Sequence, residues 1–383
     1  MKIGFDGKRA FQNRTGLGNY SRSLISILAQ HYPQHHYTLF APKQTDLFNV
    51  NAFPNTRIIT PKSFWGKRFP TLWRNKLVTK AIAESGANIF HGISNELPKG
   101  IEECSVKKIV TIHDIIYERY PDTYNFDERF IHRKKIKRSC KVADTIIAIS
   151  DQTKKDLIEI YKIPEKKIVV CHQSCNPIFE QQVSDDQKRF IKERYDLPDK
   201  YFLFVSSITK RKNLISLCKA MVSLKDKLDI PLVIIGSGKL EKKEAKKFMQ
   251  ENDLLYRLIF LNDLPQGSEF PFTSGADFPA IYQQALALVY PSIYEGFGLP
   301  ILEALWSGLP VISSNTSSMP EAGGDAALYF SPLDHKTLAA HMFSVATNTD
   351  VRNDMRNKGY AHAQNFAINK YADKMISIYE KTL

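Results

Sequence analysis

The sequence predicts an α/β protein built from two doubly wound domains, each a parallel sheet covered by helices. Short apolar runs rich in β-branched residues alternate with amphipathic helical stretches, which is typical of parallel sheets flanked by helices. This series occurs twice along a chain of 383 residues, which is longer than one core of ordinary size. We therefore expect an N-terminal domain at residues 1–178, a C-terminal domain at 179–365 and a final helix at about 366–383.

The first series contains five predicted strands with helices between several of them. The strands are expected near Lys2–Phe5, Tyr37–Ala41, Asn88–His91, Lys108–Ile112 and Thr145–Ile149. The helices are expected near Tyr20–Gln30, Thr71–Ala83, Asp127–Val142 and Asp151–Tyr161. This alternation is the one that a doubly wound domain requires.

The second series starts at Tyr201 and repeats the alternation. Its strands are expected in the segments FLFVSS, PLVIIGSG, RLIFLND, LALVYPS and PVISS. Its helices are expected near Asn213–Lys225, Lys239–Gln250, Phe278–Gln284 and Pro300–Trp306. The acidic, proline-marked segment Asn176–Lys200 lies between the two series, and we predict that it is the linker.

The composition is typical of a soluble globular protein, with 43% apolar and 24% charged residues. No stretch approaches the ~18 apolar residues expected of a membrane span. The first five residues are typical of a strand that enters a polar loop and not of a signal peptide. The five cysteines are scattered and odd in number, so we expect no disulfide framework and, by default, a cytoplasmic location.

The net charge of +13 is concentrated in two segments. Residues 62–80 hold six cations and no acid, interleaved with aromatic residues, and Arg129–Lys141 holds seven cations on a predicted helix. One interpretation is solvated faces whose long side chains cover apolar surface. The other is attraction to an anionic membrane surface. Nucleic-acid binding is not expected, because no recognition motif accompanies the charge.

The segment 290–327 carries the clearest candidate site. Glu295 and Glu303 lie eight residues apart around a Gly-Phe-Gly-Leu-Pro turn that follows an apolar strand. Open α/β sheets bind ligands at this end of their strands, and carboxylates accept hydrogen bonds from vicinal hydroxyls. Gly296 and Gly298 leave room for a sugar against the backbone. Two glutamates at this spacing also arise by chance on solvated helices, but the surrounding pattern favours a sugar-nucleotide site.

Three further segments are weaker candidates. Gly16-x-Gly18 follows the first strand and opens a helix, which suits an anion or a simple tight turn. Arg211 and Lys212 precede a helix, which suits a diphosphate or an ordinary basic loop. His113 follows a buried strand, where it either hydrogen-bonds a substrate hydroxyl, shuttles a proton or bonds the backbone structurally.

Several other motifs do not support a site. His91 repeats the argument for a histidine after a strand in weaker form. Cys171-His172-x-x-Cys175 lacks a second pair of ligands, so we expect no zinc. No Asp-x-Asp cluster suggests a metal-held diphosphate, and no Walker loop suggests phosphoryl transfer.

Taken together, these segments resemble the retaining glycosyltransferases of family 4, which have the GT-B architecture. The resemblance covers essentially the whole chain, with GLGNY, IHD, RKNL, PSIYEGFGLPILEA, SGLPVISS and MPEAGGDAA in order. It implies two Rossmann-like domains that face each other across a cleft. It also implies that the C-terminal helix, Asn369–Leu383, crosses back to the N-terminal domain.

The resemblance also implies roles for the candidate residues. Glu303 would hold the ribose hydroxyls, and Glu295 would hold the donor sugar. Lys212 would neutralise the diphosphate, and His113 would lie near the acceptor and the reacting carbon. The remaining implied donor-binding residues are Arg211 beside Lys212, Gly16 and Gly18 in the first loop, and Gly296, Phe297, Gly298 and Leu299 in the glycine turn. His113, Glu295 and Lys212 would be the catalytic set.

The implied reaction needs neither a metal nor a cofactor. A hexose would move from a nucleoside-diphosphate sugar to a hydroxyl of a glycan or lipid-linked acceptor, in cell-surface polysaccharide synthesis. The leaving phosphate would help to take the acceptor proton in a front-face displacement. GDP-mannose is the first expected donor and UDP-sugars are the next. A peripheral position on the inner face of the membrane is compatible with this chemistry.

The chain departs from the family pattern at two points. Ser206-Ser207 replaces the common Gly-Arg or Gly-Thr, and Asn19 replaces an arginine. The alternatives are a sugar-nucleotide epimerase on the same scaffold and a catalytically silent subunit that binds the nucleotide sugar. A glycoside phosphorylase is disfavoured because no segment resembles a pyridoxal-phosphate lysine site. Intact Glu295, Glu303 and Lys212 argue against the silent subunit.

Overall fold

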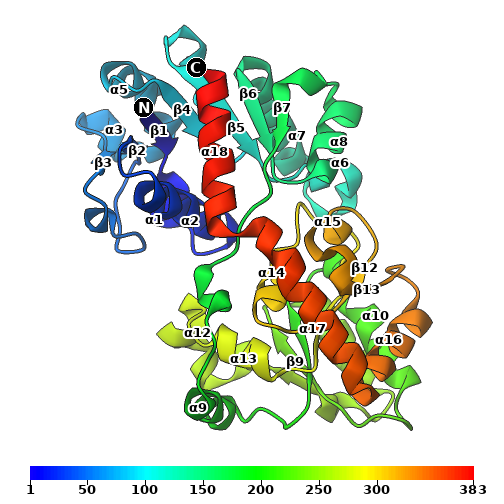
Figure 1. The fold of residues 1–383 in the computed structure, drawn as a ribbon. Helices are drawn as coiled ribbons and strands as arrows, with labels where there is room; N and C mark the ends of the chain where they lie inside the picture. The colour runs from blue at the N-terminus through cyan, green and yellow to red at the C-terminus, as the bar shows by residue number, and fades with distance from the viewer. The chain divides into compact units, whose positions relative to one another are not determined.

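The computed structural model describes the backbone of residues 1–383 and all side chains except those of residues 270 and 271. The chain divides into two compact units (Figure 1). The first unit comprises Met1–His172 and Ile368–Leu383, and the second comprises Gln173–Ala367. The boundaries expected from the sequence, at 178/179 and 365/366, differ from these by six and two residues.

The first unit contains a seven-stranded parallel sheet with the order β3-β2-β1-β4-β5-β6-β7. Its strands are β1 (Lys2–Asp6), β2 (His36–Phe40), β3 (Thr56–Ile59), β4 (Ile89–Gly92), β5 (Lys107–Ile112), β6 (Thr145–Ala148) and β7 (Ile168–Val170). The five predicted strands are present, and β3 and β7 are additional. Both additional strands lie at the edges of the sheet, where side chains are only partly buried.

Helices cover both faces of this sheet. They are α1 (Lys8–Gln12), α2 (Gly16–His31), α3 (Phe64–Arg68), α4 (Pro70–Leu72), α5 (Val78–Glu84), α6 (Ile116–Arg119), α7 (Phe126–Val142), α8 (Asp151–Tyr161) and α18 (Ile368–Thr382). One core packs α2 and α18 against the sheet, and the other packs α5, α7 and α8 against the opposite face. Each strand contributes side chains to both cores in alternation, because successive side chains of a strand point to opposite faces of the sheet.

The C-terminal helix α18 packs on the first unit, as the GT-B architecture implies (Figure 1). Its Tyr379 hydroxyl lies 2.9 Å from Nδ1 of His91, and its Asp373 accepts a hydrogen bond from Tyr32 at 2.6 Å. The predicted start at Asn369 is one residue later than the observed start.

The second unit contains a six-stranded parallel sheet with the order β10-β9-β8-β11-β12-β13. Its strands are β8 (Phe202–Val205), β9 (Leu232–Ile235), β10 (Leu258–Phe260), β11 (Ala287–Tyr290), β12 (Val311–Ser314) and β13 (Ala327–Phe330). Its helices are α9 (Asp185–Tyr195), α10 (Leu214–Ser223), α11 (Leu240–Gln250), α12 (Phe270–Ser274), α13 (Phe278–Gln284), α14 (Leu299–Trp306), α15 (Met319–Gly323), α16 (His335–Thr347) and α17 (Thr349–Ala363).

The prediction that Asn176–Lys200 is the linker is wrong, because the whole segment belongs to the second unit, which begins at Gln173. Helix α9 occupies Asp185–Tyr195 of this segment, and its Ile191 and Tyr195 are buried. Ser184 caps the helix by accepting a hydrogen bond from the backbone N–H of Gln187. The Ser-Asp-Asp-Gln sequence is a recognisable helix start, but its acidity obscured it.

Each sheet has one topological switch point, which is where open α/β sheets bind ligands. In the first unit it lies between β1 and β4, and in the second between β8 and β11. A ligand site is therefore expected on the segments that leave the carboxyl ends of these four strands. None of the helices within the described part of the chain combines the length and the apolar character needed to cross a membrane.

Candidate functional site

Two loops meet at the switch point of the second unit. The loop after β8 ends in a short helical turn, Lys210–Lys212, and the loop after β11 carries Glu295. Asn213 closes the first loop in the left-handed conformation, with φ of 58°. Its side-chain amide donates to the carbonyl oxygens of Pro291 at 3.1 Å and Pro332 at 2.7 Å. This one side chain therefore fixes the first loop against the second.

The Glu295 carboxylate sits between two cations. Lys212 Nζ lies 2.5 Å from Oε1, and Arg211 Nη1 lies 2.9 Å from Oε2. Glu295 and Lys212 are both buried. Burial alone would raise the pKa of the Glu295 carboxyl, but Lys212 and Arg211 lower that pKa to about 2. Glu295 is therefore ionised at neutral pH, and the three groups together carry one net positive charge.

The glycine turn after Glu295 is held by two serines that precede α15. Ser317 Oγ accepts a hydrogen bond from the Glu295 backbone N–H at 2.9 Å. Ser318 Oγ lies 2.7 Å from the Phe297 carbonyl oxygen and 3.0 Å from that of Glu295. Sequence reasoning missed both serines, although the SSNTSSMPE segment marks the start of α15 with hydroxyl residues.

Gly298 adopts a conformation that other residues rarely take, with φ of 122°. A Cβ atom there would lie 3.3 Å from Ile301 and 3.4 Å from Ala322. Glycine is therefore needed for the backbone turn itself. The Phe297 side chain is buried, and its ring packs edge-to-face on Phe366 at 5.6 Å. Any contact of Phe297 with a donor would thus come from its backbone.

Glu303 lies in the first turns of α14, as predicted from Pro300 near the start of the helix. Its Oε2 accepts a hydrogen bond from the Tyr282 hydroxyl at 2.9 Å. Burial raises the pKa of Glu303 to about 7, and the hydrogen bond from Tyr282 offsets part of this rise. The two glutamates therefore differ in their chemistry, because Glu295 is ionised at neutral pH whereas burial raises the pKa of Glu303 to about 7.

Gly16 and Gly18 lie inside the first turn of α2 and not in a loop before it, because the helix begins at Gly16. A Cβ on Gly18 would lie 1.8 Å from the Asn13 carbonyl oxygen, and the Gly18 N–H donates to Asn13 Oδ1 at 3.1 Å. Apart from its chain neighbours and the backbone of α2, no atom of the described residues lies within 4 Å of a Cβ on Gly16. Gly18 is thus required by internal packing, whereas the surroundings of Gly16 are open to a ligand.

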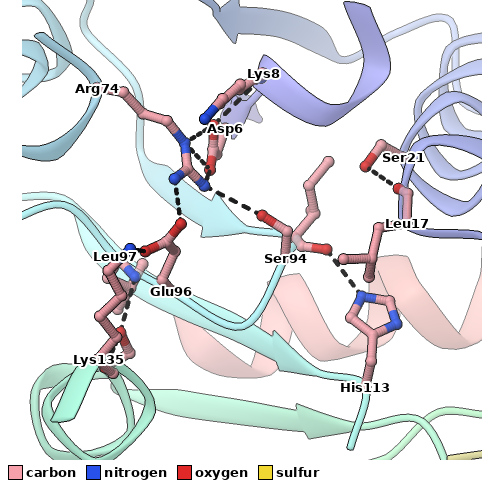
Figure 2. A network of polar contacts seen from close by, with 12 residues as sticks. Asp6, Lys8, Leu17, Ser21, Arg74, Ser94, Glu96, Leu97, His113 and Lys135 are labelled. Atoms are coloured by element: carbon pink, nitrogen blue, oxygen red, sulfur yellow. Dashed lines mark hydrogen bonds and ion pairs between the residues drawn. The ribbon is translucent and has the colours of Figure 1, made fainter. Parts of the chain in front are cut away.

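His113 follows β5 and is buried (Figure 2). Its Nε2 lies 3.0 Å from the Ile93 carbonyl oxygen. A carbonyl only accepts, so the proton is on Nε2 and the lone pair is on Nδ1. Burial lowers the pKa of His113 to about 4, and the bond to Ile93 offsets part of this effect. The imidazole is neutral at pH 7, which favours hydrogen bonding to a hydroxyl over proton shuttling.

His91 is a structural histidine. Its Nδ1 lies 2.9 Å from the Tyr379 hydroxyl and its Nε2 lies 2.8 Å from Thr111 Oγ1. Thr111 Oγ1 is also 3.2 Å from the Tyr20 hydroxyl, and the Tyr20 ring packs edge-to-face on His113 at 4.5 Å. This buried chain links α18 to α2 and to the His113 ring, and sequence reasoning did not foresee it.

The switch point of the first unit holds a buried arginine (Figure 2). Arg74 forms ion pairs with both Asp6, at the end of β1, and Glu96, after β4. It also donates to Ser94 Oγ at 3.2 Å. Burial alone would raise the pKa of Glu96, but Arg74 and Lys135 lower that pKa to about 2. Arg74 is one of the six cations of residues 62–80, and the expectation that these cations lie on a solvated or membrane-facing surface is therefore wrong for it.

The structure brings Arg211, Lys212 and Glu295 together at one switch point, with the glycine turn beside them. It places Gly16, Gly18 and His113 in the first unit. The roles of these residues toward a ligand stay predictions.

Two family models match consecutive parts of this chain. The model described as "Glycosyltransferase Family 4" matches residues 14–177, and the one described as "Glycosyl transferases group 1" matches residues 185–362. O-antigen chain mannosyltransferase B of Escherichia coli is 28% identical over 99% of this chain and 100% of its own length. O-antigen chain mannosyltransferase RfbU of Salmonella typhimurium is 29% identical over 60% of this chain and 58% of its own.

A solved structure shares the fold. Anabaena HepE in complex with UDP and glucose is 14% identical, covers 99% of both chains and superposes with a TM-score of 0.74. The two family models, the parallel sheets of both units and the order of the sequence motifs agree with one another. The chain therefore belongs to the family 4 glycosyltransferases, which have the GT-B architecture.

Proposed function

We propose that this glycosyltransferase moves a hexose, with retention of configuration, from a nucleoside-diphosphate sugar to a hydroxyl of a glycan or lipid-linked acceptor. GDP-mannose is the first candidate donor and a UDP-sugar is the next. Cell-surface polysaccharide synthesis is the proposed setting. The likeness to an O-antigen chain mannosyltransferase over the full length of both proteins supports the sugar and the setting.

One observation carries the proposal. Arg211 and Lys212 converge on Glu295 at the switch point, and this cluster of one partly buried and two buried side chains has a net positive charge. A diphosphate would be attracted to this charge and would gain charge-assisted hydrogen bonds from both cations. As the bond to the sugar breaks, negative charge develops on the leaving diphosphate, so the same cations would stabilise the transition state.

The other residues would position the reactants. Ionised Glu295 would accept hydrogen bonds from donor-sugar hydroxyls, and Glu303 would accept them from the ribose. His113 Nδ1 would accept a hydrogen bond from a hydroxyl near the reacting carbon. The leaving phosphate would help to take the acceptor proton. We propose a metal-independent reaction because Arg211 and Lys212 would supply the positive charge that the diphosphate needs.

A donor screen tests this proposal. Thermal unfolding is measured with GDP-mannose, UDP-glucose and ADP-glucose, and the matched donor at about 100 times its Kd should stabilise by about 2.7 kcal/mol. Turnover is then followed with and without a lipid extract that supplies the acceptor. The assay is repeated in the presence of EDTA. We expect acceptor-dependent turnover that EDTA leaves unchanged, and a product with the anomeric configuration of the donor.

Lys212→Gln should lose most of the donor stabilisation and activity. Lys210→Gln is the matched control, because Lys210 is an exposed cation of the same short turn. Release of epimerised sugar and free nucleotide without an acceptor would instead identify an epimerase.

A further inference from the structure

The segment between β3 and β4 carries a cluster of exposed aromatic side chains. Phe64 and Trp65 of α3 are 73% and 63% exposed, and Phe69 is also exposed. Trp65 stacks on Phe69 with ring centroids 5.8 Å apart, and Phe64 meets Trp65 edge-to-face at the same distance. These rings therefore pack on one another at the surface and not into the core of the unit.

The same segment is anchored by residues that are buried in the interior of the first unit. A π-helical turn, Trp73–Leu77, places the neighbouring residues Trp73 and Arg74 in the interior. Arg74 is clamped by Asp6 and Glu96, as described above. A Cβ on Gly66 would lie 2.9 Å from the Trp73 ring, so α3 rests on Trp73 through its one glycine. This contact turns Phe64 and Trp65 outward on a fixed base.

Cations surround the exposed rings. They are Lys62, Lys67, Arg68 and Lys76, and all four are exposed. Across the described residues, no carboxylate lies within salt-bridge distance of any of them. Arg68 lies over the Phe69 ring at 5.6 Å. A surface with aromatic side chains at its centre and cations around them matches the interface of an anionic bilayer, where rings enter the headgroup region and cations meet lipid phosphates.

Helix α7 exposes apolar side chains as well, but its charges differ. Phe126 and Phe130 are exposed, and Asp127 and Glu128 lie between them. Three cations of the basic segment Arg129–Lys141 in this helix form ion pairs with carboxylates. These pairs are Arg133 with Glu118, Lys135 with Glu96 and Arg138 with Glu102. Charge complementarity to anionic lipid therefore favours the segment 62–77 over α7.

We propose that residues 62–77 form a docking surface for an anionic phospholipid bilayer, with Phe64, Trp65 and Phe69 inserted among the headgroups. Stable attachment of a protein to a bilayer takes two signals, and this segment supplies apolar rings together with a group of cations. The proposal is independent of the donor and of the reaction, because vesicle binding is measured without either.

Trp65 provides a direct probe, because the other two tryptophans, Trp73 and Trp306, are buried. Vesicles of phosphatidylglycerol and phosphatidylcholine should shift the tryptophan emission to shorter wavelength, and brominated acyl chains should quench it. Phosphatidylcholine vesicles alone should do neither. High salt should weaken binding, because the attraction to anionic lipid is screened.

Matched variants locate the surface. The double variant Phe64→Ser with Trp65→Ser, and separately Lys67→Glu with Arg68→Glu, should each reduce vesicle partitioning by at least about tenfold. Phe126→Ser with Phe130→Ser removes two equally exposed rings from α7 and should change partitioning by no more than about twofold. Far-ultraviolet circular dichroism checks that each variant is folded.

Three results would overturn the proposal. The first is vesicle binding without quenching of Trp65. The second is loss of binding in the α7 variant alone. The third is a concentration-dependent dimer, seen by light scattering, that removes Trp65 from solvent, because this surface would then bind a second copy of the chain.

Discussion

Donor affinity should depend on pH through Glu303. Burial raises the pKa of this carboxyl to about 7 in the absence of donor. The ionised form accepts charge-assisted hydrogen bonds from the ribose hydroxyls, and these are roughly twice as strong as those that a neutral carboxyl accepts. Donor binding should therefore favour the carboxylate, lower its pKa in the complex and release a proton. The Kd for the donor should rise as the pH falls.

The size of the effect follows from the pKa. Roughly nine tenths of Glu303 is ionised at pH 8 and roughly one tenth at pH 6. The Kd should therefore rise about tenfold between these values, or about 1.4 kcal/mol. The groups that face Glu303 are Tyr282 and Cys175, and the pKa of each is raised well above its ordinary value, so neither changes charge in this range.

Isothermal titration calorimetry with the intact sugar nucleotide measures this dependence, because a diphosphate diester does not titrate between pH 6 and 8. Titrations in buffers of different ionisation enthalpy should show release of roughly half a proton at pH 7. Glu303→Gln should bind weakly and show a flat pH profile. A flat profile in the wild-type protein, or an unchanged slope in Glu303→Gln, would refute this reasoning.

Three further predictions concern stability and turnover. Gly18→Ala should destabilise the protein by about 1–3 kcal/mol in denaturant unfolding, because its Cβ would collide with a backbone carbonyl, whereas Gly16→Ala should unfold like the wild type. Tyr379→Phe should cost about 1–3 kcal/mol, because it leaves a nitrogen of buried His91 without its hydroxyl partner, and an unchanged midpoint would contradict that bond. Ser318→Ala should lower kcat more than it raises KM, because the glycine turn loses a hydroxyl that holds its carbonyls, and a change in KM alone would contradict this role.

The strands missed in the sequence are those at sheet edges. Strands β3, β7 and β13 are edge strands, and most of their side chains are half-buried. The continuous apolar run that marks a strand buried on both faces is therefore short or absent in them. Central strands such as β8 and β11 were predicted because they are covered on both faces.

The sequence predicts those parts of the candidate site in which glycine, proline and charged residues lie close together along the chain. The turn at Gly298 and the start of α14 follow from local backbone chemistry, so the sequence alone predicts them. The ion pair of Lys212 with Glu295 joins residues 83 positions apart, and the Arg74 clamp joins residues 68 positions apart. Such pairs depend on strand order, which local patterns do not encode. Arg74 was therefore predicted to lie with the exposed cations around it.

The central claim is that Lys212 and its partners hold the diphosphate of a sugar donor during transfer. The most direct measurement follows the transfer of labelled mannose from GDP-mannose to an acceptor in a lipid extract. The GDP released in the same reaction is quantified. The wild type and Lys210→Gln should form GDP and glycosylated acceptor one to one, and Lys212→Gln should be slower by about a hundredfold or more. Full turnover by a folded Lys212→Gln protein, or release of GDP without any labelled acceptor, would contradict the claim.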